Sequence, residues 1–238
     1  MSAISHQASA QDISLAAQKS VVASFARPQA VNLSSSRAAA SRGKRLFDIA
    51  FSLAILLVLL PVMILIALAI RMDSPGPAIF RQVRMGKDQR PIRIYKFRTM
   101  RHELCDHSGV AQTTANDPRV TRLGAFLRKT NLDELPQFLN VLLGDMSVVG
   151  PRCHAIGILA AGVPYEELVP EYHLRHAVRP GITGLAQVRG WRGPTSDRVH
   201  ARARILCDLH YIENYSFRMD LRIILATLKN EIRGGTGF

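Results

Sequence analysis

The stretch from Ile49 to Ile70, IAFSLAILLVLLPVMILIALAI, contains 22 residues and no charged side chain. At about 1.5 Å per residue, a helix of this length crosses the hydrocarbon layer of a bilayer, which is about 30 Å thick. Pro61 falls near the middle of the stretch, where a proline ring removes a backbone hydrogen bond and bends a helix. The stretch therefore predicts a membrane helix that bends at Leu60 and Pro61.

Basic residues flank this stretch at both ends: Arg42, Lys44 and Arg45 come before it, and Arg71, Arg81, Arg84 and Lys87 come after it. A helix that crosses the membrane carries its excess of Lys and Arg on the cytoplasmic side only. Basic flanks on both sides favour a re-entrant helix, which enters one leaflet, bends at the proline and returns to the cytoplasmic face. A spanning helix stays an alternative, because membrane helices tolerate proline.

The charge of the whole chain indicates an anionic partner. Lys and Arg number 31 against 18 Asp and Glu, a net charge of +13 at pH 7 with His neutral. Such an excess suits nucleic acid, acidic lipid head groups or a phosphorylated substrate. Aromatic residues make up 6% of the chain, too few for a base-stacking surface, so we expect no nucleic-acid partner. Three cysteines about fifty residues apart form no metal or redox pair, which favours a reduced cytosolic setting.

Composition divides the chain into three parts. Residues 1–41 are dominated by Ser, Ala and Gln without a sustained apolar period, and they predict a disordered tail with no signal for export. Residues 42–71 form the membrane-associated helix. Residues 72–238 are long enough for one folded cytosolic domain.

Hydrophobic periodicity in residues 72–238 predicts a mixed α/β, helix-rich domain. Residues 78–80 and 92–97 look like short strands, the second with clear alternation. Leu135, Phe138, Leu139 and Leu142 recur at helical spacing, so we expect a helix that starts near Asp133. The remaining predicted segments are a strand and turn over 147–152, a helix over 164–176, a turn over 179–181, and helices over 198–215 and 221–232.

Asp133 and Glu134 are adjacent carboxylates at the start of a predicted helix, directly after basic Arg128 and Lys129. Acidic residues complement the dipole at a helix N-terminus, and this is one interpretation of the pair. The catalytic interpretation is that an ionised Asp attacks phosphorus to give an acyl phosphate, while a second carboxylate helps to hold Mg²⁺. Basic residues suited to clamp a diphosphate are Lys96, Arg98, Arg152, Arg175 and Arg179. Motifs of dinucleotide enzymes, P-loop enzymes, serine hydrolases and zinc proteases are absent from the sequence.

Eight motifs occur in a fixed order along residues 42 to about 230. They are Lys44-Arg45-Leu-Phe-Asp48, Asp73-Ser-Pro-Gly-Pro77, Tyr95-Lys-Phe-Arg-Thr-Met100, Asn116-Asp-Pro-Arg-Val-Thr121, Leu132-Asp-Glu-Leu-Pro-Gln137, Gly144-Asp-Met-Ser-Val-Val-Gly-Pro-Arg152, Arg179-Pro-Gly-Ile-Thr-Gly184 and Tyr211-Ile-Glu-Asn214. Together they resemble the bacterial sugar transferases, the monotopic polyprenyl-phosphate hexose-1-phosphate transferases, in their minimal form.

The resemblance implies an enzyme on the cytoplasmic face of the bacterial inner membrane, in contact with its lipid through a re-entrant helix broken at Pro61. It implies transfer of a hexose 1-phosphate from a UDP-sugar to undecaprenyl phosphate, with Mg²⁺ as cofactor and UMP as product, at the start of exopolysaccharide or related glycan assembly. Asp133 matches the nucleophile of the family, and Glu134 matches its partner in metal binding or proton handling. Among the matching substrate-binding positions are the phosphate contacts Lys96, Arg128 and Arg152 and the acidic Asp208.

The sequence departs from the family pattern at several motif positions. Cys153 replaces the second proline of Pro-Arg-Pro, Asn131 replaces a serine, and Leu185 and Arg189 replace Trp and Asn. A catalytically degenerate member that acts as a scaffold or adaptor in polysaccharide assembly is therefore the alternative. The segments 151–155 and 190–193 are closer to members that load glucose or galactose than to those that load N-acetylated amino sugars. The sequence leaves a homo-oligomer open.

Overall fold

A computed structural model describes residues 41–106, 113–114, 117–193, 195 and 197–233. The predicted disordered tail, residues 1–41, lies outside these residues except for Ser41, and so does Asn116 of the motif at 116–121.

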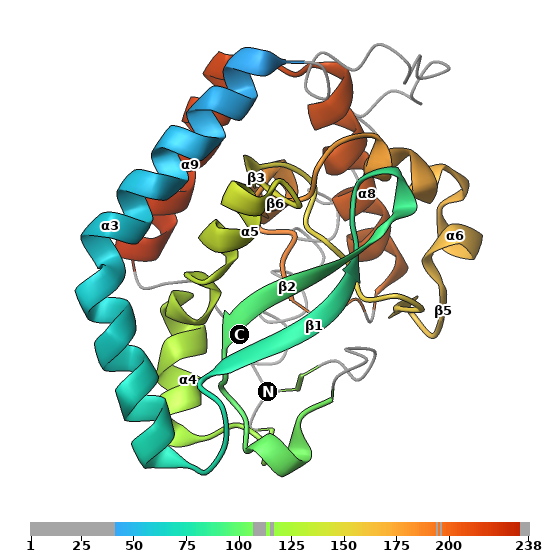
Figure 1. Ribbon diagram of the computed structural model, residues 1–238. Coiled ribbons are helices and arrows are strands. Elements are labelled where there is room, and N and C mark those ends of the chain that lie inside the picture. The colour runs from blue at the N-terminus through green and yellow to red at the C-terminus, as the bar shows by residue number, and fades with distance from the viewer. Residues whose placement is uncertain (1–40, 107–112, 115–116, 194, 196, 234–238) are drawn as a thin grey trace, which may run out of the picture.

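The fold is helix-rich mixed α/β, as predicted (Figure 1). The helices are α3 (Arg42–Asp73), α4 (Arg122–Lys129), α5 (Gln137–Leu143), α6 (Tyr165–Leu168), α7 (Leu185–Val188), α8 (Arg198–Glu213) and α9 (Phe217–Ile232). The strands are β1 (Ile79–Met85), β2 (Pro91–Phe97), β3 (Ser147–Val149), β4 (Leu159–Ala160), β5 (Val163–Pro164) and β6 (Gly181–Thr183). Short 3-10 segments are Lys87–Gln89, His102–Leu104, Leu132–Glu134 and Pro170–Ala177.

The strands pair in twos within the described residues. β1 and β2 are antiparallel, with Phe80 opposite Lys96, and they confirm the predicted strands at 78–80 and 92–97. β3 confirms the predicted strand at 147–152 and pairs in parallel with β6, while β4 and β5 form a short antiparallel pair. The predicted turn at 179–181 is wrong at its last residue, because Gly181 starts β6. A Cβ atom there would come within 2.1 Å of the Gly150 nitrogen, so close backbone pairing requires glycine.

Two predicted helices differ from the structure, and proline is the reason in both. The helix expected to start near Asp133 begins only at Gln137, because Pro136 has no N–H group to continue a helix from the 3-10 turn Leu132–Glu134. The helix expected over 164–176 is divided into α6 and a 3-10 segment that starts at Pro170. The helices predicted at 198–215 and 221–232 are confirmed as α8 and α9.

Helix α3 contains the apolar stretch, and most of that stretch is exposed. The Ser41 side chain caps its first turn by accepting a hydrogen bond from the Lys44 amide, and Pro61 lies inside the helix. The ribbon changes direction about half-way along (Figure 1). Only 6% of its most apolar window is buried, so by length and composition α3 is able to cross a membrane. Its exposed large apolar residues are Leu46, Ile49, Leu53, Leu57, Val58, Leu60, Val62, Ile64, Leu65, Leu68 and Met72.

Both ends of α3 are attached to the same folded domain. Near the start, Lys44 Nζ lies 2.7 Å from Asp220 Oδ2 on α9, and Ser147 Oγ donates to Asp48 Oδ2 over 2.7 Å. At the far end, the Arg98 guanidinium donates to the carbonyl oxygens of Ile70 and Ser74. Removal of either attachment would leave a buried charge unpaired, so these contacts fix where the helix emerges from the domain.

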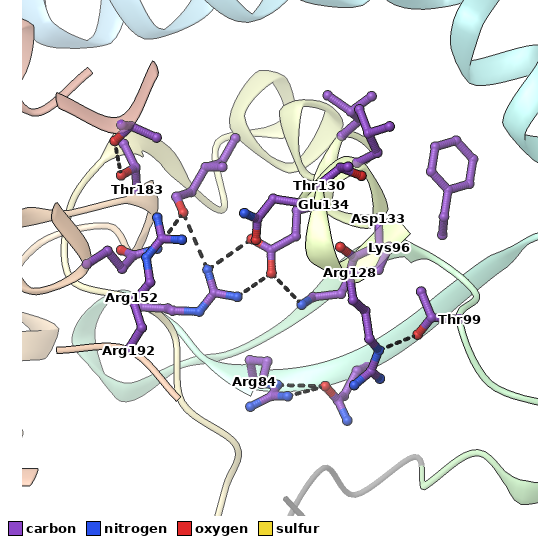
Figure 2. A pocket seen from close by; sticks show the side chains of 18 of the residues that line it. Arg84, Lys96, Thr99, Arg128, Thr130, Asp133, Glu134, Arg152, Thr183 and Arg192 are labelled. Atoms are coloured by element: carbon purple, nitrogen blue, oxygen red, sulfur yellow. Dashed lines mark hydrogen bonds and ion pairs between the residues drawn. The ribbon is translucent and has the colours of Figure 1, made fainter. Parts of the chain in front are cut away.

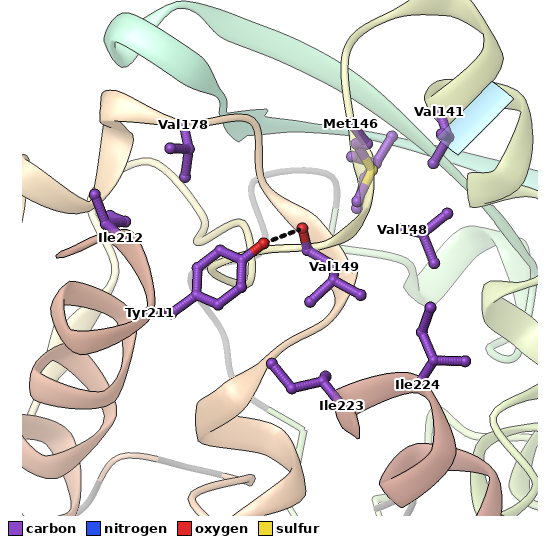
Figure 3. Packing of buried hydrophobic residues seen from close by; sticks show 10 residues of the cluster. Val141, Met146, Val148, Val149, Val178, Tyr211, Ile212, Ile223 and Ile224 are labelled. Carbon is purple, nitrogen blue, oxygen red and sulfur yellow. Dashed lines mark hydrogen bonds between the residues drawn. The ribbon is translucent and has the colours of Figure 1, made fainter. Parts of the chain in front are cut away.

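The main hydrophobic core joins the segments that carry the site (Figure 3). It packs α5, β3, α8 and α9 together through the buried residues Ile94, Val141, Met146, Val148, Val149, Val178, Tyr211, Ile212, Ile223 and Ile224. The Tyr211 hydroxyl donates to Asp220 Oδ1 over 2.8 Å and lies 3.2 Å from the Val149 carbonyl oxygen. The core therefore holds α5 and β3, the elements that follow the carboxylate pair, against the last two helices.

Candidate active site

A cavity of about 670 Å³ lies between α3, the β1–β2 pair, the Leu132–Glu134 turn and α9. Part of its apolar wall comes from α3 and α9: Phe51, Ile55, Leu59, Ile224 and Leu228. Its basic wall consists of Arg84, Lys96, Arg98, Arg119, Arg128, Arg152, Arg192 and Arg204. One cavity therefore offers cations beside a surface that continues onto exposed apolar side chains of α3.

The carboxylate pair sits on the 3-10 turn Leu132–Glu134 at the edge of this cavity (Figure 2). Asn131 precedes the turn with a φ of 53°, in the left-handed region. Asparagine is among the few residues other than glycine that adopt this conformation readily. The turn directs both carboxylates toward the cavity although they are neighbours in sequence.

Glu134 is held by two cations. Lys96 Nζ donates to its Oε1 over 2.7 Å, Arg152 Nη1 donates to its Oε2 over 2.9 Å, and Arg152 Nη2 also binds Oε1. Burial alone would raise the pKa of Glu134, but the charges of Arg152 and Lys96 outweigh it and hold that pKa far below its ordinary value. Glu134 is thus ionised at any physiological pH and keeps both cations at the base of the cavity.

Asp133 has the opposite electrostatic setting. Its side chain is buried, at 8% exposure, and it accepts no hydrogen bond from any described residue. Burial raises its pKa to about 6, against the lowering charge of Lys96 and with support from the Glu134 charge. An ionised carboxylate with little solvation and no bonded partner is a reactive oxygen nucleophile.

Arg128 contributes a further cation to the cavity. Its Nε donates to Thr99 Oγ1 and its Nη1 to Thr113 Oγ1, each over 2.8 Å, so hydroxyl groups orient it. Burial lowers its pKa, and Asp133 is the nearby charge that most opposes this. The structure therefore brings Lys96, Arg128 and Arg152 together with the carboxylate pair, as the sequence predicted.

Arg175 and Asp208 form a buried pair behind the cavity. Arg175 Nη2 lies 2.7 Å from Asp208 Oδ2 and 2.5 Å from the Arg152 carbonyl oxygen. Both side chains are almost fully buried, so Arg175 positions the Arg152 backbone from behind. Asp208 lines the cavity while it neutralises Arg175.

Arg98 and Arg179, like Arg175, were predicted phosphate ligands and have other partners in the structure. Arg98 lines the cavity, but its guanidinium donates to carbonyl groups at the end of α3. Arg179 Nε donates to the Gly144 carbonyl oxygen over 2.7 Å at the C-terminal end of α5. Arg45 caps the same helix end by donating to Val141 and Leu142. Cations at a helix C-terminus stabilise its unpaired carbonyls, so Arg179 is a helix cap in this structure.

Sequence reasoning missed two groups of cavity residues. Arg84 lies on the cavity face of β1, and strand alternation with Phe80 opposite Lys96 would have indicated it. Glu231 on α9 accepts a hydrogen bond from Asn131 Nδ2 over 2.9 Å and lies 3.6 Å from Arg192 Nη1. No local pattern reveals this second link, because Asn131 and Glu231 are 100 residues apart.

Of the two carboxylates, Asp133 is the one that suits Mg²⁺. The described residues contain no cluster of three or more His, Cys, Asp and Glu side chains suited to a metal ion. Mg²⁺ bound with phosphates needs only one or two protein carboxylates, because phosphate oxygens and water complete its shell. Asp133 fits this mode, whereas both oxygens of Glu134 are already bonded to Lys96 and Arg152. The donor set thus suits a metal ion shared between Asp133 and a phosphorylated ligand.

Comparison with known proteins identifies relatives of the chain. The family model described as "Bacterial sugar transferase" matches residues 39–234. The exopolysaccharide production protein PSS of Rhizobium leguminosarum bv. phaseoli is 64% identical over 195 residues, which cover 82% of this chain and 98% of that protein. The UDP-glucose:undecaprenyl-phosphate glucose-1-phosphate transferase of Escherichia coli K12 is 50% identical over 185 residues, 78% of this chain and 39% of that protein.

A protein of the same printed name from Caulobacter vibrioides is 47% identical over 192 residues, 81% of this chain and 70% of that protein. The chain thus spans nearly the whole Rhizobium protein and about two fifths of the E. coli protein. With the family model covering most of the chain and the carboxylate pair in a basic cavity, the chain belongs to the bacterial sugar transferase family.

Proposed function

We propose that the protein transfers a hexose 1-phosphate from a UDP-sugar to undecaprenyl phosphate and releases UMP, as the step that initiates exopolysaccharide assembly. The printed names of the E. coli and Caulobacter relatives describe this reaction with UDP-glucose, so glucose is the sugar we propose. The observation that carries the proposal is Asp133: a buried carboxylate without a bonded partner among the described residues, beside three cations.

Two displacements at one phosphorus atom account for the reaction. An Asp133 oxygen attacks the sugar-linked phosphorus of the donor, the bond between the two phosphates breaks, and the bridging oxygen leaves with UMP. An oxygen of undecaprenyl phosphate then attacks the same phosphorus and releases the Asp133 carboxylate. With all phosphates ionised, charge balances in both steps without a proton transfer. A covalent intermediate of this kind gives ping-pong kinetics.

The other residues of the site serve charge stabilisation and positioning. Lys96 and Arg152, held by Glu134, and Arg128, held by Thr99, place fixed cations near Asp133, where they would stabilise the charge of substrate phosphate oxygens. Such fixed donors need no reorganisation during the reaction. Asp133 would hold Mg²⁺ together with the substrate phosphates, and the ion, when bound, supplies Lewis-acid stabilisation of phosphate charge.

The contacts of α3 support a re-entrant arrangement at the cytoplasmic face of the inner membrane. A domain that binds the helix at Lys44 and Asp48 and again at Ile70 keeps both helix ends on its own side of the bilayer. Pro61 and the bend of the ribbon supply the change of direction (Figure 1). The apolar wall of the cavity, continuous with α3, suits the polyprenyl chain of the acceptor.

The geometry around the departures from the family pattern favours an active enzyme over a degenerate scaffold. Asn131 occupies a left-handed position that suits asparagine, and it keeps the catalytic turn in place through Glu231. Arg152 binds both oxygens of Glu134 although Cys153 follows it. Neither substitution displaces a group that the proposed chemistry needs.

The test is UMP release by the purified protein in detergent or lipid, with Mg²⁺, undecaprenyl phosphate and a panel of UDP-sugars. We expect UMP from UDP-glucose that depends on undecaprenyl phosphate for repeated turnover and is lost in Asp133→Asn. Absence of UMP with every donor, from folded and membrane-bound protein, would favour the scaffold role instead. If another UDP-sugar is the preferred donor, the proposed sugar is wrong and the proposed reaction is unchanged.

A further inference from the structure

Arg84 is a cation of the cavity whose charge no described carboxylate balances. It lies on β1 in the alternating series Phe80, Gln82, Arg84, and all three side chains line the cavity. Lys96 and Arg152 share the charge of Glu134, whereas no carboxylate of a described residue is within ion-pair distance of Arg84. Figure 2 shows Arg84 below the Glu134 ion pairs, on the strand side of the cavity.

A neutral side chain fixes the orientation of this guanidinium. Gln82 Oε1 accepts from Arg84 Nε over 2.8 Å and also from Arg84 Nη2. Gln82 is itself buried and donates through Nε2 to the Asp106 carbonyl oxygen over 3.3 Å. The guanidinium is therefore held in one direction, and its remaining N–H donors are available to a ligand.

The groups that surround Arg84 do not balance its positive charge. Glu134 and Asp106 act on it from a distance, the Cys153 thiol is nearby, and Arg152 repels it. Burial lowers the pKa of Arg84, which means that the cation loses more hydration than its surroundings replace. A half-buried guanidinium in this condition is a preformed site for an anion, and its planar fork suits phosphate oxygens.

We propose that Arg84 is a further phosphate-binding residue of the active site, which with Arg128 makes a two-point clamp on a substrate phosphate. Arg128 is another cavity guanidinium that neutral groups orient, through the hydroxyls of Thr99 and Thr113. The inference rests on the proposed function for the identity of the substrate. The phosphate belongs either to the nucleotide-sugar donor or to the polyprenyl acceptor, and kinetics separate the two sources.

The test compares Arg84→Gln with Arg81→Gln in the full-length, lipid-bound protein. Arg81 precedes Arg84 on the opposite face of β1, is exposed and does not line the cavity, so the two variants lose the same charge from the same strand. We expect Arg84→Gln to lower kcat/KM by about 10- to 100-fold, the loss typical of one or two charge-assisted hydrogen bonds. Arg81→Gln should stay within about 2-fold of the unmodified protein.

Three further measurements separate binding from folding. If Arg84 binds a phosphate of the donor, Arg84→Gln should raise the KM for the UDP-sugar and slow the first UMP burst. If Arg84 binds the phosphate of the acceptor, the variant should raise only the KM for undecaprenyl phosphate. Arg84→Lys keeps the charge without the planar fork and should recover part of the loss. Inorganic pyrophosphate should raise the melting temperature of the unmodified protein and of Arg81→Gln but not that of Arg84→Gln.

The outcomes distinguish this inference from the proposed function. Equal kinetics of the Arg84→Gln and Arg81→Gln variants, or equal protection of both by pyrophosphate, would overturn the role of Arg84. So would a kinetic loss that matches the unfolded fraction, with full activity in the folded remainder. If the unmodified protein makes no UMP while pyrophosphate protection still depends on Arg84, the anion site stands and the proposed reaction fails.

Discussion

Asp133 and Glu134 are neighbours, yet their removal should change stability in opposite directions. The pKa of Asp133 rises from its ordinary 3.8 to about 6 on folding, so its ionised form destabilises the folded protein above that pH. At about 1.4 kcal/mol for each pH unit, the difference amounts to about 3 kcal/mol at pH 7.5. Asp133→Asn removes this charge and should stabilise the protein while it abolishes transfer.

Glu134→Gln should destabilise the protein instead. The folded protein holds the pKa of Glu134 below its ordinary 4.5, so this carboxylate stabilises the fold at every pH above that value. The variant leaves Lys96 and Arg152 without their anion. The lost charge-assisted hydrogen bonds should lower the free energy of unfolding by about 1–3 kcal/mol. Both variants thus remove one negative charge from the same turn, but they change the free energy of unfolding in opposite directions.

The assay is thermal unfolding in detergent micelles with EDTA, at pH 7.5 and pH 5.0. Each kcal/mol shifts the melting temperature of a domain of this size by about 2–4 °C. Asp133→Asn should therefore melt several degrees higher at pH 7.5, and this gain should shrink at pH 5.0, where Asp133 is mostly protonated. The deficit of Glu134→Gln should persist at pH 5.0. Asp88→Asn, at an exposed left-handed position that suits asparagine, is the control and should change stability by less than about 0.5 kcal/mol.

The reasoning is refuted if Asp133→Asn melts below the unmodified protein at pH 7.5, or if its gain is the same at both pH values. A lower melting temperature would mean that the Asp133 carboxylate has a stabilising partner in the folded protein, and an equal gain at both pH values would mean that its charge is not the cause.

Further predictions concern the cap of α5, the turn that follows Asn131, and helix α3. Arg179→Gln should lower the free energy of unfolding by about 1 kcal/mol and leave the KM for the UDP-sugar unchanged, since Arg179 caps α5; a raised KM would restore it as a phosphate ligand. Asn131→Val should destabilise by about 1–2 kcal/mol in a melting experiment because of its left-handed φ, whereas Asn131→Gly should keep most of the stability. In the re-entrant arrangement that we propose, cysteines placed at positions 40 and 87 should both be labelled from the cytoplasmic side. Pro61→Leu removes the cause of the bend, so a fraction of these molecules should then be labelled from opposite sides. Unchanged labelling would show that the contacts at both ends of α3 determine its path.

Strand alternation and helical spacing predicted the elements in which the burial of a residue follows from its position along its own strand or helix. Residues 92–97 alternate because Ile92 and Ile94 pack on the main core while Arg93 between them is exposed, and α9 packs Ile223 and Ile224 on the same core. The start of the helix at Asp133 was wrong because spacing alone does not register the missing N–H of Pro136. This error matters for the site, because both carboxylates lie on a separate 3-10 turn and not at the N-terminus of a helix.

The functions of the arginines were the least predictable part of the site. A long flexible side chain reaches about the same distance in many directions, so sequence cannot show whether Arg98 and Arg179 bind phosphate or backbone carbonyls. Their partners lie 24 to 35 residues away, at the ends of α3 and α5. The carboxylate pair was predictable because adjacent residues stay together in any fold, and its cations were indicated by the family motifs.

The most direct measurement is the mass of the intact protein after incubation with UDP-glucose and Mg²⁺ in the absence of undecaprenyl phosphate. We predict an increase equal to one hexose phosphate, located on Asp133 by peptide mapping, one equivalent of UMP, and loss of the adduct when undecaprenyl phosphate is added. An unmodified protein that releases UMP only when both substrates are present would contradict the covalent role of Asp133.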